Sequence, residues 1–402
     1  MNNNENKILN VPHLRFPEFT GEWSKHRLGD VMAFKNGLNK GKEFFGTGTP
    51  IVNYMDVNKN ENIVSSMIKG VVTVTNCEIE NFQIIKGDVF FTRTSETSDE
   101  IGLSASLLEE IPKGVFSGFI LRGRPISGVF EPSFSGYYFR SERIRKEIIK
   151  HSSITTRALT SGSSLSQLNI SIPSLEEQSK IARLLELIDK KLDSQRKLID
   201  LYKSLIKTLR EKLFDHKSNN LLGNEINFIN GYAFDPKTYD VNGKYYVCTI
   251  SNVNGDRYLD LTQVNRVSEI PKDLNTNQQL FSGDILMSLT GNVGRVSIVE
   301  YNNGLLNQRV AKIEVKNKTS SNFIYHALSS EKFLKYVKKQ SQGSSQNNIY
   351  YKNIEKFALP NFDSNKRLLS VLDKIDFLII NHSFLLQRLI GIKIFLLQNM
   401  FI

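Results

Sequence analysis

The sequence predicts an α+β protein: two mixed α/β domains in tandem, each followed by a long helix, with the two helices packed on each other. Three observations lead to this fold class. Residues 175–214 are a stretch of 40 residues without Gly or Pro, residues 364–402 repeat its apolar pattern, and the segments before the two stretches share turns at matched spacings. A chain of 402 residues is long enough for two domains that each bury a core.

Residues 1–174 are expected to contain a disordered polar lead, 1–12, and the first domain. Apolar and β-branched runs between Gly-rich turns predict four strands, and helical spacing of apolar residues predicts a helix over 135–151. The expected strands cover residues 51–57, 71–74, 88–92 and 116–122. Trp23, the single tryptophan, is interpreted as a core anchor.

The central helix is expected over residues 175–214. Ile172-Pro173 favours an extended approach to the helix, Ser174 is a suitable N-cap, and Glu176 and Glu177 fall in the first turn. Apolar residues recur in adjacent heptad rows, which predicts a stripe broad enough to bury against another long helix. The expected interface positions on this helix are Ile181, Leu185, Ile188, Leu192, Ile199, Tyr202 and Ile206.

Residues 215–363 repeat the plan of the first domain. Asn36-Gly37 matches Asn230-Gly231 at an offset of 194, and 51–57 matches 247–253 at an offset of 196. At that same offset, Gly87-Asp88 matches Gly283-Asp284, and a helix over 321–338 mirrors the one over 135–151. Two domains that share their turns but differ in their loops would have the same framework and could each recognise a different target.

The C-terminal helix, residues 364–402, follows the central helix at a constant offset of 187. Upstream, Gly162-Ser163-Ser164 matches Gly343-Ser344-Ser345 at an offset of 181, which predicts a small insertion in the second copy. The expected interface positions on the C-terminal helix are Leu372, Ile375, Ile379, Leu386 and Leu389.

Composition indicates a basic protein without a membrane span. The net charge of +11 and pI near 9.3 favour a nucleic-acid partner, although simple solubility charge explains them equally well. The polar start argues against a secretory leader, and no run approaches the ~18 apolar residues of a membrane span. Two cysteines, Cys77 and Cys248, suggest a reducing compartment, so we expect a cytoplasmic protein.

The catalytic motifs in the sequence are weak. Phe44 to Gly48 formally fits a methyltransferase glycine loop, but a strand rather than a helix should follow it. Glu314-Val315-Lys316 with Asp284 imitates a nuclease site that the first half lacks, and 290–295 fits a plain turn better than a phosphate nest. The six histidines show no metal-ligand spacing. We therefore expect no catalytic residue, metal or cofactor in this chain.

Loops at matched places in the two copies carry side chains suited to DNA. Hydroxyls contact phosphates, while Arg, Asn and Gln can bond to guanine or adenine edges. For any single residue a solvated loop position is the more common role, so the argument rests on matched placement. The candidates are Lys35, Asn36, Lys40, Lys42, Thr92, Arg93, Thr94 and Ser95 in the first half, and Ser288, Thr290, Asn292, Arg295, Gln308 and Arg309 in the second, with Asn307 beside them.

With the repeat, the helices and these loops together, the chain resembles the specificity (S) subunits of type I restriction–modification systems. The resemblance covers nearly the whole chain. Two features depart from it: 361–366 lacks the Glu-Glu-Gln of 176–178, and 94–98 replaces the Thr-Gly-x-x-Gly turn of 290–294. The resemblance is carried by the turns at Gly87 and Gly283 and by residues 161–164, 172–181, 188–189 and 290–294.

The resemblance implies a non-catalytic subunit that reads a bipartite, asymmetric double-stranded DNA target with two target recognition domains. Its helices would pair antiparallel, space the domains, and dock two modification (methyltransferase) subunits, to which restriction/translocase subunits add. S-adenosylmethionine, ATP and Mg²⁺ would act through those partners. Two alternatives stay open: an interaction scaffold that does not touch DNA, and a methyltransferase or nuclease that acts alone.

Overall fold

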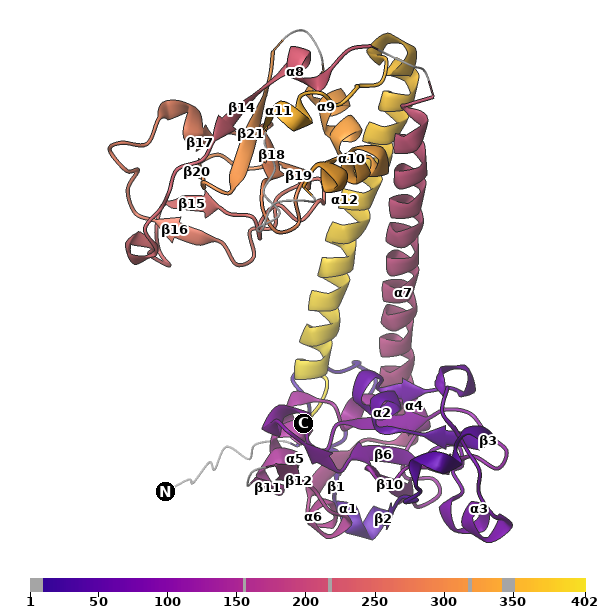
Figure 1. Cartoon of the computed structure of the whole chain (residues 1–402). Coiled ribbons are helices and arrows are strands. Elements are labelled where there is room, and N and C mark those ends of the chain that lie inside the picture. The colour runs from indigo at the N-terminus through magenta and orange to yellow at the C-terminus, as the bar shows by residue number, and fades with distance from the viewer. Residues whose placement is uncertain (1–9, 155–156, 216–218, 317–319, 342–350) are drawn as a thin grey trace, which may run out of the picture. The chain divides into compact units, whose positions relative to one another are not determined.

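The structure is a computed structural model that describes residues 10–154, 157–215, 219–316, 320–341 and 351–402. The chain divides into two compact units (Figure 1). Unit 1 comprises residues 1–194 and 386–402, and unit 2 comprises residues 195–385. Each unit therefore holds one globular domain together with segments of both long helices. Most of the predicted lead, residues 1–9, and Gly343–Ser345 lie outside the described residues.

A five-stranded sheet organises the first domain, in the order β2-β10-β6-β8-β4, with β10 antiparallel to both β2 and β6. Its central strand β6 is buried at every position, because Val89 and Phe91 pack in one core cluster and Phe90 packs in another on the opposite face. The strands of unit 1 are β1 (Ser24–Arg27), β2 (Met32–Asn36), β3 (Phe45–Val52), β4 (Asn62–Ile63), β5 (Val71–Val72), β6 (Val89–Thr92), β7 (Thr94–Ser95), β8 (Ser104–Leu107), β9 (Val115–Phe116), β10 (Ile120–Pro125), β11 (Ser153–Ile154), β12 (Ala158–Leu159) and β13 (Asn169–Ile172).

Short helices cover this sheet and connect its strands. The helices of unit 1 before the long helices are α1 (Leu28–Val31), α2 (Tyr54–Lys59), α3 (Asn76–Phe82), α4 (Pro132–Tyr138), α5 (Glu142–Lys150) and α6 (Gly162–Ser166), with 3-10 turns η1 (Lys42–Phe44), η2 (Ser65–Met67) and η3 (Ser98–Glu100). Trp23 is 2% exposed and packs edge-on against Phe134, as a core anchor would.

The second domain repeats the central part of this sheet in the order β14-β21-β18-β19, with β14 antiparallel to β21 as β2 is to β10. Its strands are β14 (Ile226–Asn230), β15 (Tyr245–Cys248), β16 (Asn265–Val267), β17 (Gln279–Leu280), β18 (Ile285–Ser288), β19 (Val296–Ile298), β20 (Gly304–Leu306) and β21 (Val310–Val315). Its helices are α8 (Leu222–Glu225), α9 (Ser321–Leu328), α10 (Glu331–Ser341) and α11 (Tyr351–Ile354), with 3-10 turns η4 (Pro236–Thr238) and η5 (Thr276–Gln278).

A close approach of two loops explains the matched Asn-Gly pairs. A Cβ atom at Gly37 would lie 2.1 Å from the Ser117 carbonyl oxygen, and one at Gly231 would lie 2.0 Å from that of Asn307. No side chain fits in that space, so glycine is required at the same place in both domains.

Several predicted strands are shorter than expected, and local capping explains the clearest case. The strand expected over 51–57 ends at Val52, where Asn53 and Asp56 form a capping box that starts α2. Its counterpart ends at Cys248, because the Asn252 side chain accepts a hydrogen bond from the Thr249 N–H. The strands expected over 71–74, 88–92 and 116–122 become β5, β6 and the pair β9 and β10.

Both predicted domain helices are in fact two helices each. The expected helix 135–151 divides into α4 and α5 around Ser141, which starts α5 and whose hydroxyl donates to the Tyr138 carbonyl. The expected helix 321–338 divides into α9 and α10 at Ser330, whose hydroxyl donates to the Ala327 carbonyl and accepts from the Phe333 N–H. A serine before the second helix leaves the apolar spacing on either side almost unchanged.

The two long helices, α7 (Leu175–Lys212) and α12 (Phe362–Asn399), have 38 residues each. Ser174 accepts a hydrogen bond from the Glu177 N–H, as predicted for an N-cap. The second helix begins two residues before the predicted Ser364, because the Asn361 side chain accepts a hydrogen bond from the Ser364 N–H.

The long helices pack on each other in both units and run antiparallel. In unit 1, Ile181 and Leu185 of α7 share a core cluster with Leu396 of α12. In unit 2, Ile206 shares one with Leu372 and Ile375. The start of α7 therefore meets the end of α12, and the reverse holds in unit 2. All twelve predicted interface residues are buried or half-buried.

A polar pair lies within the helix seam of unit 2. Gln195 is 3% exposed, and its side-chain oxygen lies 2.6 Å from Nδ1 of His382, whose ring stacks on Tyr202. His382 is the repeat counterpart of Gln195, since the two positions differ by 187. A residue that meets its own counterpart is what an antiparallel pair of repeats produces at its centre.

Candidate nucleic-acid interface

The predicted DNA-reading residues gather at one edge of each main sheet. In the first domain this edge is formed where β2 and β6 end and β10 begins, and Leu121 of β10 lies opposite Asn36 of β2. In the second domain it is formed by the ends of β14 and β18 and the start of β21, where Ala311 lies opposite Asn230. The register is therefore the same in both.

At the first-domain edge, three predicted residues, Lys35, Asn36 and Arg93, surround a pocket of about 270 Å³. Lys35 Nζ donates to the Asn81 carbonyl oxygen at 2.5 Å and lies 5.4 Å from the Phe82 ring centroid. Asn36 is exposed and Arg93 half-exposed. The complete lining of this pocket, hereafter the Phe34 pocket, is Phe34, Lys35, Asn36, Arg93, Leu121, Ser161, Gly162 and Ser163.

The two other first-domain lysines lie on the neighbouring loop and differ in availability. Lys40 forms an ion pair with Glu78 at 2.8 Å and covers the Phe44 ring. The hydrogen bond from Lys40 lowers the pKa of the Glu78 carboxyl, so that the pair is charged at neutral pH. Lys42 is exposed in η1. The lysine charge open to a phosphate is therefore mainly that of Lys42.

Three predicted hydroxyl residues are structural. Thr92, Ser95 and Ser288 are 0%, 6% and 1% exposed. Thr92 donates to the Glu100 carbonyl and Ser288 to the Asn292 carbonyl, while Ser95 accepts from the Thr97 N–H. We correct the prediction here: these side chains hold the loops together and do not face solvent. Thr94 is half-exposed.

The second-domain edge presents a different set of side chains. Gln308 and Arg309 are exposed, and the Arg309 carbonyl accepts from the Leu289 N–H, which places both residues beside the end of β18. Asn292 and Arg295 are exposed on the following turn, which Gly291 and Gly294 close with positive φ angles. Thr290 Oγ1 is buried and has no hydrogen-bond partner among the described residues.

Two features of the first-domain edge were missing from the predicted set. Phe119 is 68% exposed, and its carbonyl accepts from the Arg93 N–H. Phe34 forms part of the pocket wall, with Ser161 and Ser163 close by. An aromatic residue beside a lysine, as in Phe34-Lys35, was a usable signal, because stacking and charge commonly act together on nucleic acid.

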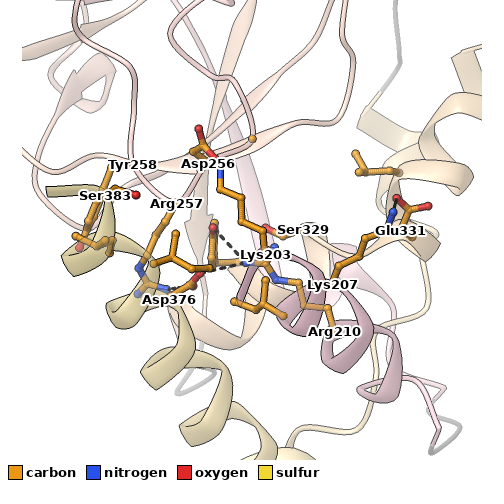
Figure 2. A pocket seen from close by; sticks show the side chains of 16 residues that line it. Lys203, Lys207, Arg210, Asp256, Arg257, Tyr258, Ser329, Glu331, Asp376 and Ser383 are labelled. Atoms are coloured by element: carbon orange, nitrogen blue, oxygen red, sulfur yellow. Dashed lines mark hydrogen bonds and ion pairs between the residues drawn. The ribbon is translucent and has the colours of Figure 1, made fainter. Parts of the chain in front are cut away.

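Another pocket, of about 440 Å³, lies in unit 2, where the second domain meets the long helices (Figure 2). Arg257 donates to Asp376 at 2.6 Å, and Arg210 lies 3.6 Å from the same carboxylate. Figure 2 shows these side chains converging from a loop, from α7 and from α12. Burial acts to lower the pKa of Arg257, but the charge and hydrogen bond of Asp376 outweigh it and raise that pKa. The pocket thus borders an ion-pair cluster of Arg257, Arg210 and Asp376 that joins the domain to the long helices, hereafter the anchor.

His326 extends this anchor. It is fully buried, receives a hydrogen bond from Arg210 at Nδ1, and its Nε2 lies 3.1 Å from Asp373. Burial lowers the pKa of His326 against the opposing Asp373 bond, and the Arg210 charge lowers it further. The neutral imidazole that donates from Nε2 fits both partners.

Unit 1 has the corresponding anchor at equivalent positions. Asp189, the counterpart of Asp376, accepts a hydrogen bond from Tyr137 at 2.7 Å and pairs with Lys393 of α12 at 2.7 Å. Glu186, the counterpart of Asp373, accepts a hydrogen bond from Ser133. In both units, carboxylates of one long helix hold the domain helix and a cation of the other long helix.

The weak enzyme motifs do not assemble a site. The Phe44–Gly48 loop leads into strand β3 and opens no helix. Asp284 pairs with Lys312 at 2.7 Å, and Glu314 accepts from Asn227. Across the described part of the chain, no group of three or more His, Cys, Asp or Glu side chains is placed to hold a metal ion.

Helix α12 presents a large apolar surface. By length and composition alone it is apolar enough to cross a membrane, and only 11% of its most apolar window is buried. Phe377 and Phe395 on this helix are 62% and 55% exposed. Leu201 and Leu187 on α7 are 61% and 54% exposed. Such patches commonly mark interaction surfaces.

Comparison with known proteins gives one family over most of the chain. The family model described as "Type I restriction modification DNA specificity domain" matches residues 20–201 and 223–389. The chain is 25% identical to the type I restriction enzyme MjaVIII specificity subunit of Methanocaldococcus jannaschii, over 93% of this chain and 90% of that protein.

Two solved structures share the fold. The crystal structure of the type I restriction–modification S subunit from M. genitalium aligns with a TM-score of 0.59 and 16% identity, over 98% of this chain and 99% of that one. A chain from a structural study of type I restriction–modification complex assembly aligns with a TM-score of 0.54 and 18% identity, over 96% and 98% of the two chains.

Proposed function

Because the chain belongs to the type I restriction modification DNA specificity domain family, we propose that it is the subunit that selects the DNA target of a type I complex. The observation that carries this proposal is the pair of equivalent sheet edges. Both keep the same strand register and the same glycine-closed loop approach, yet the side chains they present differ. A shared frame with different surfaces suits two domains that read different half-sites.

Recognition is divided between phosphate and base contacts. Lys42 and Arg295 are exposed cations suited to phosphates. Asn36 in the first domain, and Gln308 and Arg309 in the second, have the groups that form paired bonds to adenine or guanine edges in the major groove. Since the two sets differ, the bipartite target is asymmetric.

The long helices are the docking surface for partner subunits. The exposed apolar side chains on α7 and α12 support this assignment, because such area in a complex is normally covered. Two modification subunits would dock there and restriction/translocase subunits would join them. S-adenosylmethionine, ATP and Mg²⁺ would be used by these partners and not be held by this chain.

The apolar character of α12 is better explained by protein partners than by a membrane. Asp373, Asp376 and Lys393 lie along this helix and form ion pairs with Arg257, Asp189 and Glu61 within their own units. A helix whose charged residues form ion pairs with its own protein is suited to packing among protein helices. We therefore propose a cytoplasmic location beside the DNA.

Methylome sequencing of cells with and without this gene tests the function. We expect an asymmetric, bipartite adenine-methylation motif that disappears when the gene is deleted. A gel shift with the assembled complex should show affinity that falls steeply with salt, because phosphate contacts release counterions. An unchanged methylome together with salt-independent partner binding would instead favour the scaffold alternative, and methylation by the purified chain alone would favour an enzyme.

A further inference from the structure

The place in the second domain that corresponds to the Phe34 pocket is filled by a side chain of that domain, Tyr351. There, the Tyr351 ring stacks on Phe228, with centroids 4.5 Å apart and planes within 8°. The Tyr351 hydroxyl donates to the side-chain oxygen of Asn230. Burial raises the pKa of Tyr351 to about 12, so this hydroxyl stays protonated and donating at neutral pH.

The two places correspond residue by residue. Phe228 and Asn230 follow Phe34 and Asn36 at the offset of 194, and the Gly162 position of the first domain corresponds to Tyr351, at an offset of 189. Framework contacts fix this match: Leu28 N–H bonds to the Leu168 carbonyl as Leu222 N–H bonds to that of Phe357, and Gly29 faces Ser166 as Gly223 faces Glu355. The match of 162–164 with 343–345 predicted from sequence is therefore wrong.

The walls of the two places differ in charge. Lys35 and Arg93 line the open pocket, whereas Ile229 and Leu289 stand at their positions in the second domain and pack into core clusters. Arg93 has no hydrogen-bond or ion-pair partner for its side chain among the described residues, and neither has Asn36. Cations and an exposed amide without a protein partner thus accompany the open aromatic face, and apolar residues accompany the filled one.

We propose that the Phe34 pocket binds one nucleotide of the recognised DNA, whose base leaves the duplex stack. This inference rests on the proposed DNA-reading function and names the ligand of one of its domains. The base stacks on Phe34 as Tyr351 stacks on Phe228, the Asn36 amide bonds to the base edge, and Arg93 binds the adjoining phosphate. A flat ring, a polar edge and a negative charge together define a nucleotide.

Phe119 is placed to occupy the gap that the extruded base leaves in the stack. Its side chain is 68% exposed and its carbonyl is bonded to the Arg93 N–H, so it lies beside the pocket. When a base leaves a duplex, apolar side chains commonly occupy the gap in the stack. The counterpart of Phe119 in the second domain is Arg309, which suits contact with a base edge instead. Among the described residues, the first domain therefore combines the Phe34 pocket with the exposed Phe119 side chain, whereas the second domain has Tyr351 and Arg309 at these places.

A mismatch scan tests the proposal with the full chain in its complex. Each base pair of the half-site bound by the first domain is replaced in turn by a mismatch, and binding is measured by competition. Extrusion is easiest from a mismatched pair. We expect one position at which the mismatch tightens binding severalfold. Phe34→Leu should keep the core packing of this residue but weaken binding about tenfold, the effect of losing one base–aromatic stack, and should abolish the gain.

Phe228→Leu is the matched control, because its aromatic face is occupied by Tyr351, and it should leave the mismatch gain intact. Arg93→Gln is the second variant should Phe34→Leu fold poorly, and it should reduce the gain as well. A flat scan in a complex that still binds its target would overturn this inference and leave the proposed function standing. Loss of all specific binding in the wild-type complex would remove both.

The source of the nucleotide is tested separately. Adenosine monophosphate is titrated into the DNA-free complex, with Phe34→Leu as the reference. We expect weak binding that target DNA outcompetes. Tight binding that depends on Phe34, together with a flat mismatch scan, would assign the pocket to a soluble nucleotide and refute uptake of a DNA base.

Discussion

Replacing Asp376 with Asn removes the carboxylate on which two guanidinium groups of unit 2 converge. The Asp376 side chain is 6% exposed, while those of Arg257 and Arg210 are 16% and 11% exposed. The amide keeps the side-chain volume, so no cavity forms, and the cost comes from two half-buried cations that lose their counter-charge. Breaking a buried pair in this way costs about 3 kcal/mol.

Urea unfolding of the full chain measures this cost. With a denaturant slope of about 2 kcal/mol per M, 3 kcal/mol shifts the midpoint by about 1.5 M. Trp23 is the only tryptophan and lies in the core of unit 1, so its fluorescence reports on that unit, whereas far-UV circular dichroism reports on both. We expect the dichroism transition of unit 2 to move to lower urea. Asp363→Asn, which breaks an exposed pair with Lys366 on the same helix, is the control and should leave the midpoint unchanged. A shift no larger for Asp376→Asn than for this control would refute the anchor.

The remaining predictions concern pH, the helix seam, DNA contacts and spacing. The pKa of His326 lies below its unfolded value near 6.5, so on acidification the unfolded state binds a proton before the folded state does. Unit 2 should therefore lose stability from pH 7 to pH 5.5, by up to about 1.4 kcal/mol per pH unit. The urea midpoint of His326→Gln should lack that pH dependence. His382→Leu should destabilise the chain by about 1–3 kcal/mol by leaving Gln195 buried and unpaired, whereas Gln195→Leu with His382→Leu should recover the urea midpoint. Arg309→Ala should relax selectivity in one half-site only, and Lys42→Ala should weaken all sequences alike and lower the salt slope by about one, as read from binding isotherms. One added heptad in each long helix preserves the seam and adds about 10 Å, so the spacer in the methylome motif should grow by about three base pairs with unchanged half-sites.

The long helices could be predicted from sequence because their pattern extends over five heptads and averages out local irregularity. Their ends could not, since Asn361 acts as a cap that propensity does not rank above Ser364. The strand expected over 51–57 failed for a similar reason. Ile51, Val52 and Val57 are β-branched, but Asn53 and Asp56 form a capping box and turn the chain into α2 after Val52.

The candidate site was predictable in its loops but not in its contacts. Asn36 and Arg93 lie at one sheet edge because Asn36 ends β2, Arg93 follows β6, and both strands pair with β10. Whether a hydroxyl faces solvent or a backbone carbonyl depends on how the loop closes. The prediction that Thr92 and Ser288 face DNA was therefore wrong. The Phe34 pocket depends on residues near 34, 93, 121 and 162, and no local pattern reports that these meet.

The distribution of differences between the two copies separates support from recognition. The anchors keep their chemistry, since Asp189 and Asp376 each accept a hydrogen bond from the domain helix or loop and form an ion pair with a cation of the other long helix. At the sheet edges the chemistry changes instead, from Lys35 and Arg93 to Ile229 and Leu289. If the edges were only structural, their side chains would be held to the same packing requirement as the anchors. Divergence of the exposed edge, on a frame whose register is unchanged, is what separate half-sites would produce.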